Sequence, residues 1–204
     1  MSQIKICGLS RTQDIVYVNE ARPDYVGFIM NFPRSHRNVT PEQVRVLRQK
    51  LAEDIQAVGV FVDQPIESIS AIAQHTGIDF IQLHGSESEQ DIELLQKQTK
   101  LPVIKAFQIR SSEDLQKAQN SCADYILLDS GQGTGTQFDW SLLGSVHRPY
   151  FLAGGLTPEN MAEAIHKLHP FALDVSSGVE TEKQKDAQKI KRAVAIAHEK
   201  QEEE

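Results

Sequence analysis

The chain of 204 residues has little cysteine: Cys7 and Cys122 stand far apart, in no spacing typical of metal ligands. This argues against a disulfide framework or a zinc site and favours a reducing compartment. The sequence also lacks about 18 consecutive apolar residues, the length that crosses a bilayer. Met1–Gly8 shows no basic stretch followed by a long apolar run. We therefore predict an untargeted, cytoplasmic protein without membrane contact.

Positive charge is scarce as well, with 21 Lys and Arg against 28 Asp and Glu and a net charge of -7. A negative protein repels nucleic acid and anionic lipid, so neither is expected as a partner. A small anionic ligand is still compatible with this charge. A few backbone N–H groups and one arginine can form a local positive site for it.

No long stretch rich in Pro, Gly and Ser interrupts the chain, and 40% hydrophobic with 24% charged residues is ordinary for a soluble domain. A chain of this length can bury one self-sufficient core. We therefore predict a single domain over residues 1–204, with residues 201–204 as a disordered tail.

Short apolar runs alternate with stretches of helical periodicity along the whole chain, as expected for parallel strands covered on both faces. An open doubly wound sheet usually has five or six strands, whereas a closed parallel barrel has eight. The pattern therefore predicts an α/β fold, a (β/α)8 TIM barrel. The eight expected strands are Ile4–Cys7, Tyr25–Ile29, Ala57–Val62, Phe80–Leu83, Val103–Phe107, Tyr125–Asp129, Tyr150–Ala153 and Ala172–Val175.

Helix start signals stand between these runs. Thr40-Pro41-Glu42 offers Thr as N-cap and Pro at the first helical position, and Thr157-Pro158-Glu159 repeats the arrangement. Ser111–Asp114 is typical of an N-cap followed by acidic residues in the first turn. The last helix is predicted over roughly 185–199.

In a parallel barrel the active site lies at the carboxyl ends of the strands, so polar residues that close an apolar run are the first candidates. Cys7 and Asp129 close two such runs, and the glycine-rich segment Ser130–Gly135 follows Asp129. A cysteine in an apolar strand is more often inert packing. A carboxylate at a strand end needs solvent, a partner or a ligand, so Asp129 is the stronger candidate.

Two further loops indicate a phosphate site. Ala153–Leu156 closes the seventh strand and Val175–Glu180 closes the eighth, the loops that commonly share a phosphate in this fold. Glycine allows backbone N–H groups to approach the anion, although the same glycines could serve only tight turns. We predict backbone recognition of phosphate here, because neither segment contains Lys or Arg.

Several other residues at the same mouth are ambiguous. Arg34 and Arg37 follow the second strand, and either could bind a carboxylate or remain a solvated charge. His84 is as suited to bonding the loop backbone as to contacting a ligand. Lys5 is expected on the face of its strand opposite to Cys7, so we do not assign it to activating the thiol.

The ordered motifs resemble those of the phosphoribosylanthranilate isomerase family and span nearly the whole chain. They are Lys5–Gly8, Gly27–Ile29, Ser35–Val39, Gly59–Val62, Gln82–Gly85, Gly133–Gly135 with Phe138–Trp140, Gly154–Leu156 and Asp174–Glu180. Gln132 departs from the pattern, because the family usually has a glycine there, which puts the closure of this loop in doubt.

The resemblance implies an Amadori rearrangement of N-(5-phosphoribosyl)anthranilate in tryptophan biosynthesis, with no metal or organic cofactor. Asp129 would be the general acid and Cys7 the general base, and Arg37 would bind the anthranilate carboxylate. The other residues expected to bind the phosphorylated substrate are Gly154, Gly155, Asp174, Ser176, Ser177 and Gly178. A monomer is expected, and a homodimer stays open.

Two alternatives remain at this point. Another phosphate-binding barrel, such as an indole-glycerol-phosphate synthase or a phosphoribosyl isomerase of histidine biosynthesis, would need catalytic Lys and Glu or paired Asp residues at strand ends. A catalytically silent barrel could bind a phosphorylated metabolite as a sensor. Cys7 and Asp129 favour the isomerase, because a pure binder needs neither an acid nor a base.

Overall fold

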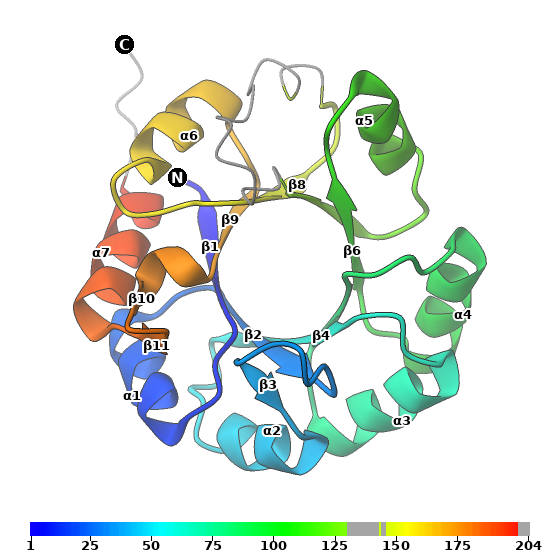
Figure 1. The fold of residues 1–204 in the computed structure, drawn as a ribbon, viewed down its shortest axis with the longest axis horizontal. Helices are drawn as coiled ribbons and strands as arrows, with labels where there is room; N and C mark the ends of the chain where they lie inside the picture. Colours follow the sequence, from blue (N-terminus) through cyan, green and yellow to red (C-terminus); the bar gives the residue numbers. More distant parts are fainter. Residues whose placement is uncertain (130–142, 144–145, 200–204) are drawn as a thin grey trace.

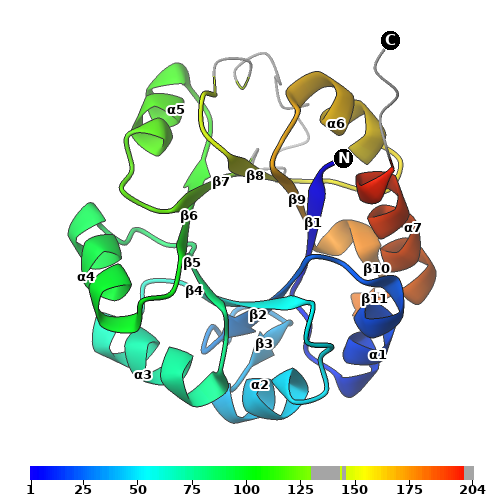
Figure 2. The same cartoon turned by 180° about the vertical axis from the view of Figure 1, so that it is seen from behind.

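The computed structural model describes residues 1–129, 143 and 146–199, and eight of the described strands form a closed parallel barrel ringed by helices (Figures 1 and 2). Neighbouring strands pair in chain order, and the pairing of the first strand with both β2 and β9 closes the ring. The barrel strands are β1 (Gln3–Cys7), β2 (Tyr25–Met30), β4 (Gln56–Phe61), β5 (Phe80–Leu83), β6 (Val103–Gln108), β7 (Tyr125–Asp129), β8 (Tyr150–Ala153) and β9 (Ala172–Val175). The predicted (β/α)8 barrel is confirmed, with strand ends shifted by at most one residue.

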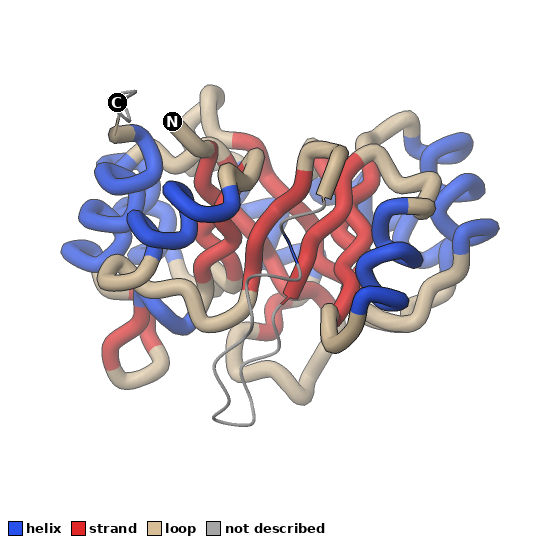
Figure 3. Tube along the Cα trace, turned by 90° about the horizontal axis from the view of Figure 1, so that it is seen from above, coloured by secondary structure: helices blue, strands red, loops and turns tan. Residues whose placement is uncertain are grey.

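Three short strands were not predicted. β3 (Asn38–Val39) adds to β2, and β10 (Glu180–Thr181) pairs with β11 (Gln184–Lys185) as an antiparallel hairpin. Two-residue strands carry no periodic signal in a sequence. Figure 3 shows this hairpin at the end of the barrel opposite the amino terminus.

Helices cover the outside of the barrel and run between successive strands. Their bounds are α1 (Thr12–Ala21), α2 (Pro41–Arg48), α3 (Ile66–Thr76), α4 (Glu89–Thr99), α5 (Ser112–Gln119), α6 (Met161–Leu168) and α7 (Ala187–His198). α7 packs between α6 and α1, so the last helix joins the first beside the closing strand pair. None of the described helices has the length and apolar character needed to cross a membrane.

The helix start signals were right at two places and wrong at a third. Thr40 and Ser111 are the N-caps of α2 and α5, and each accepts a hydrogen bond from the backbone three residues on. Thr157 instead begins a turn that precedes α6, which starts after Asn160. α7 begins after the N-cap Asp186, two residues later than predicted.

Two predicted segments, the glycine-rich loop Ser130–Gly135 and the tail 201–204, lie outside the described residues.

Apolar side chains form two packed layers. One cluster fills the space between strands and helices, and a second lies inside the barrel. The buried members of the inner cluster are Tyr25, Val58, Ile104, Leu127, Phe151, Ala153 and Ala172. The barrel strands also bury three polar side chains, those of Lys5, Gln82 and Lys105. A buried polar group is costly unless it is paired, so these three residues point to function.

We expect Leu127→Ala to lower the free energy of unfolding by about 2–5 kcal/mol, because Leu127 is fully buried inside the barrel. Leu94→Ala is the matched control, since Leu94 is 39% exposed on α4 and should change stability by no more than about 0.5 kcal/mol. Urea unfolding of both variants measures the difference, and equal losses would contradict the assignment of the inner core.

Candidate active site

A cavity of about 620 Å³ opens at the carboxyl ends of the strands, as the barrel fold requires. Its walls include seven of the residues predicted from the sequence: Cys7, Asp129, Gly154, Gly155, Asp174, Ser176 and Ser177. Arg37 instead lines a neighbouring hollow, and Gly178 packs against the backbone of Leu156. The structure thus brings together both candidate catalytic residues and most of the predicted binding residues.

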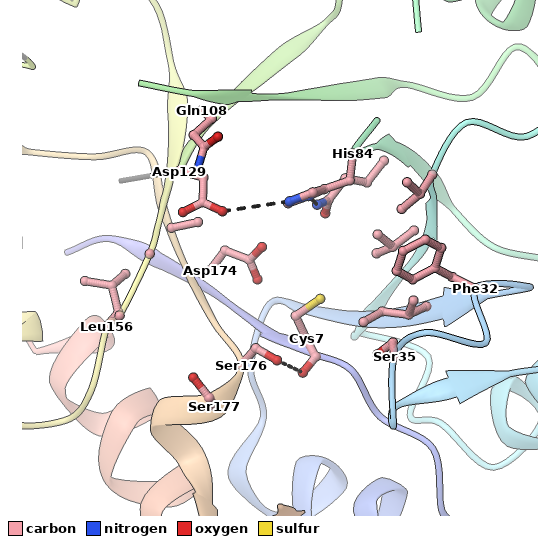
Figure 4. A pocket seen from close by; sticks show the side chains of 17 residues that line it. Cys7, Phe32, Ser35, His84, Gln108, Asp129, Leu156, Asp174, Ser176 and Ser177 are labelled. Carbon is pink, nitrogen blue, oxygen red and sulfur yellow. Dashed lines mark hydrogen bonds and ion pairs between the residues drawn. The ribbon is translucent and has the colours of Figure 1, made fainter. Parts of the chain in front are cut away.

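Asp129 and His84 face each other on one wall of the cavity (Figure 4). His84 Nε2 lies 3.8 Å from Asp129 Oδ2, and His84 Nδ1 lies 3.0 Å from the amide nitrogen of Gln82. An amide nitrogen only donates, so Nδ1 accepts and the imidazole proton sits on Nε2, directed at Asp129. Burial lowers the pKa of His84 despite the attraction of Asp129, so the ring is neutral at neutral pH.

Gln82 was missed by the sequence analysis as a site residue. It is buried in the cavity wall, and its Oε1 is an acceptor for which no hydrogen-bond partner is found among the described residues. A buried acceptor left unpaired is costly, so this glutamine is a feature that stability alone does not explain. The signal available in the sequence was a glutamine inside an otherwise apolar strand.

Cys7 lies on the opposite wall, where its sulfur points into the cavity (Figure 4). Lys5 lies next to it inside the barrel, and its Nζ donates to both carboxylate oxygens of Asp174 at 2.9 and 3.0 Å. The prediction that Lys5 faces away from Cys7 is therefore wrong. Side chains alternate along a strand with a period of two, so residues 5 and 7 share one face.

Burial governs the proton affinities at this wall. Desolvation raises the pKa of the Cys7 thiol, and the charge of Lys5 opposes that rise without cancelling it. For Lys5 burial acts to lower the pKa, but the attraction of Asp174 and Cys7 outweighs it and the pKa is raised. Lys5 therefore stays an ammonium ion inside the barrel.

The predicted phosphate loops meet at the rim of the cavity. Gly154 and Gly155 have φ values of 99° and 63°, in the left-handed region that favours glycine. A Cβ at position 178 would overlap the carbonyl oxygen of Leu156, so the two loops touch through a glycine. Ser176 Oγ donates to the Cys7 carbonyl oxygen at 3.1 Å, which ties the second loop to the base of the site.

Arg37 lies in a cluster of charges behind this loop that the sequence analysis did not foresee. Arg37 Nε and Nη2 donate to the two carboxylate oxygens of Glu180 at 2.6 and 2.7 Å, and Lys185 Nζ donates to Glu180 Oε1 at 2.7 Å. Lys185 also donates to the Ser176 carbonyl oxygen at 2.9 Å. Burial alone would raise the pKa of Glu180, but the hydrogen bonds from Arg37 and Lys185 lower it to about 2.

A third buried ion pair supports the loop that follows β5. Lys105 Nζ donates to the Gly85 carbonyl oxygen at 2.6 Å and to Glu87 Oε2 at 2.9 Å, directly beyond His84. This fixes the loop from which His84 reaches the cavity. Within the described residues, no three His, Cys, Asp or Glu side chains are grouped as metal ligands would be.

We expect acid to destabilise the protein partly through Glu180. Its pKa falls from 4.5 to about 2 on folding, so its stabilising effect is complete above about pH 4.5 and is lost as the pH falls towards 2. Glu180→Gln should lower Tm at pH 7 and flatten its decline below pH 4.5. Glu163→Gln is the control, because Glu163 pairs with Lys167 on the exposed surface and should keep the wild-type slope. Equal acid slopes in the wild type and Glu180→Gln would contradict this account.

Comparison with known proteins gives a consistent result. The sequence profile of the family described as N-(5'-phosphoribosyl)anthranilate (PRA) isomerase matches residues 4–195. The enzyme of that name from Endomicrobium trichonymphae is 42% identical over 201 residues, covering 96% of this chain and 98% of its own. The crystal structure of phosphoribosyl anthranilate isomerase from Thermotoga maritima superposes with a TM-score of 0.88 at 36% identity, covering 97% of this chain and 98% of that one.

A second crystal structure of such an isomerase, in complex with reduced 1-(o-carboxyphenylamino)-1-deoxyribulose 5-phosphate, has a TM-score of 0.86 at 36% identity and covers 97% of this chain and 98% of that one.

Proposed function

The chain belongs to the phosphoribosylanthranilate isomerase family, and on that premise we propose that Asp129 and Cys7 are the acid and the base of its reaction. The reaction is the isomerisation of N-(5'-phosphoribosyl)anthranilate in tryptophan biosynthesis, an Amadori rearrangement. One observation carries the proposal: a carboxyl group and a thiol line the same cavity, beside two loops suited to phosphate. Proton transfers of this kind use side-chain groups, so we propose neither a metal nor an organic cofactor.

Asp129 acts first in the proposed sequence of steps. In its protonated form it donates to the furanose ring oxygen, and the C1′–O bond breaks as the nitrogen lone pair forms a Schiff base. The carboxylate that remains faces the N–H of His84, whose Nε2 lies 3.8 Å away. A neutral imidazole that donates towards this oxygen stabilises the conjugate base without adding a second titrating charge.

Cys7 then removes the C2′ proton as a thiolate. The electron pair of the C2′–H bond moves into the Schiff base and gives an enolamine, which tautomerises to the ketone product. The sulfur is positioned because the Cys7 carbonyl oxygen is bound by Ser176 and β1 is paired on both sides. A thiol must lose its proton to serve as a base, so whatever stabilises the thiolate controls this step.

Arg37 is proposed to bind the anthranilate carboxylate. Glu180 occupies two of its five N–H donors through Nε and Nη2, which leaves the other donors of the planar guanidinium for a ligand. The Arg37 side chain passes directly over Gly8, the residue after Cys7, so it lies near the base. Glu180 thereby holds the guanidinium group of Arg37 in one orientation, which lowers the entropy lost when the carboxylate binds.

The phosphate is proposed to bind the backbone of Gly154, Gly155, Ser176, Ser177 and Gly178, with Asp174 also contributing to the substrate site. The left-handed glycines and the turn at Ser177 are arrangements that expose N–H groups to an anion. Lys185 lies behind Ser176, where its charge adds to the local positive potential.

We further propose that the protein acts as a monomer in the cytosol on this small phosphorylated molecule. The cavity walls come from one chain, so a single copy holds the residues proposed to act. Cys7 and Cys122 are both free thiols, which suits a reducing compartment. Among the relatives, one crystal structure is of monomers generated from the dimeric Thermotoga maritima enzyme.

The acid and base roles are tested by single variants assayed through the loss of substrate fluorescence. Asp129→Asn and Cys7→Ser should each lower kcat by about 10²–10⁴-fold, since both groups act on the transition state. Cys122→Ser is the control, because the second cysteine is on the surface and should leave kcat unchanged. Wild-type kcat in either active-site variant would remove that residue from the mechanism.

The phosphate site is tested by Gly155→Val, which should raise KM and weaken competitive inhibition by inorganic phosphate. A β-branched side chain at φ 63° would distort the turn and cover the N–H groups. Gly77→Val is the matched control, with φ 67° at the end of α3 and open space around it. It carries the same backbone strain, so it should lower stability but keep KM. Unchanged KM in Gly155→Val would place the phosphate elsewhere.

A further inference from the structure

Lys5 is a fully buried cation inside the barrel, and the proton transfers proposed above do not employ it. Its ammonium group forms an ion pair with Asp174 across the junction of β1 and β9. Burying such a pair costs more in desolvation than its attraction usually returns, and apolar residues would fill the space at lower cost. The pair therefore calls for a reason other than stability.

The position of Gly27 supplies that reason. In β2, Gly27 stands in register with Cys7, and a Cβ placed on it would lie 2.7 Å from Cys7 Sγ and 3.1 Å from Lys5 Nζ. The sulfur and the ammonium group thus reach into the same small space from alternate positions of one strand, on the same face. Any side chain at residue 27 would separate them.

We propose that Lys5 is a positioning residue whose ammonium group stabilises the thiolate of Cys7, and that Gly27 leaves the space in which the two groups meet. The inference rests on the proposed function only in taking Cys7 as the base. It gives the buried ion pair a purpose: Asp174 keeps Lys5 protonated in a place where burial alone would strip its proton.

Four charged groups act on the sulfur, and they do not act alike. Burial raises the pKa of Cys7, and the charge of Lys5 is the largest influence that lowers it, ahead of that of Lys185. Asp174 opposes them because it repels a thiolate. Arg37 also feels the charge of Cys7, although its hydrogen bonds go to Glu180. Without Lys5, the thiolate would face the Asp174 carboxylate with only the weaker influence of Lys185 and Arg37 to balance it.

The test measures the thiol itself, through the rate of alkylation by iodoacetamide as a function of pH. A Cys122→Ser background leaves Cys7 as the only cysteine of the chain. Lys5→Met should move the midpoint of the profile upward by about one unit or more, which slows alkylation about tenfold at pH 7.5. An unchanged profile in this variant would overturn the proposal.

The double variant Lys5→Met with Asp174→Asn separates this role from a structural one and leaves no unpaired buried charge to unfold the protein. If Lys5 serves only to neutralise Asp174, removing both charges restores the wild-type profile, and the proposal is overturned. If Lys5 stabilises the thiolate, the midpoint of the double variant stays above that of the wild type.

Gly27→Ala tests the space between the two groups while keeping both charges. It should also raise the midpoint, whereas Gly59→Ala in β4 should not, because a Cβ there meets Ile78, Met30 and Phe61 instead of the thiol. An unshifted midpoint in Gly27→Ala would overturn the part given to Gly27. These outcomes are independent of turnover: wild-type kcat in Cys7→Ser would refute the base assignment without altering the alkylation profiles.

Discussion

The closure of the barrel between β1 and its two neighbours is the constraint on which the site depends. β1 pairs with β2 on one side and with β9 on the other, so residues about 170 positions apart along the chain become adjacent. Closure also removes the free strand edges that an open sheet would leave. The register of these two pairings, and not any local preference, places Lys5 beside Asp174 and Cys7 beside Gly27.

The interior of the barrel is apolar at one end and carries charged side chains at the other, where the cavity opens. This arrangement controls the chemistry at the mouth of the barrel. An apolar cluster that includes Leu127 and Phe151 excludes water from below. Charged groups placed above such a layer interact strongly, because little solvent screens them. The same burial that raises the pKa of the Cys7 thiol makes the nearby ammonium effective. Two further buried pairs, formed by Lys105 and by Glu180, hold the loops that carry His84 and Ser176.

Much of the fold could be predicted because each barrel strand is covered on both faces and therefore appears as an apolar run. The helix starts at Thr40 and Ser111 were found for a similar reason, since an N-cap is a local hydrogen bond. The prediction of a helix start at Thr157 was wrong because a Thr-Pro-Glu sequence can also begin a turn. The face of Lys5 was misjudged although the alternation of a strand determines it. Glu180 and Lys185 carried no local signal of a role, because their partners come from distant segments.

The sequence by itself determined the barrel, the ends of its strands and the set of residues at its mouth, because these follow from local periodicity and from the rule that parallel strands end on one side. The resemblance of its motifs to those of the family indicated the reaction. Only the tertiary structure decided which of those residues touch. It placed Arg37 against Glu180, His84 against Asp129 and a buried lysine beside the thiol, because such contacts depend on strand register and on desolvation across the whole ring.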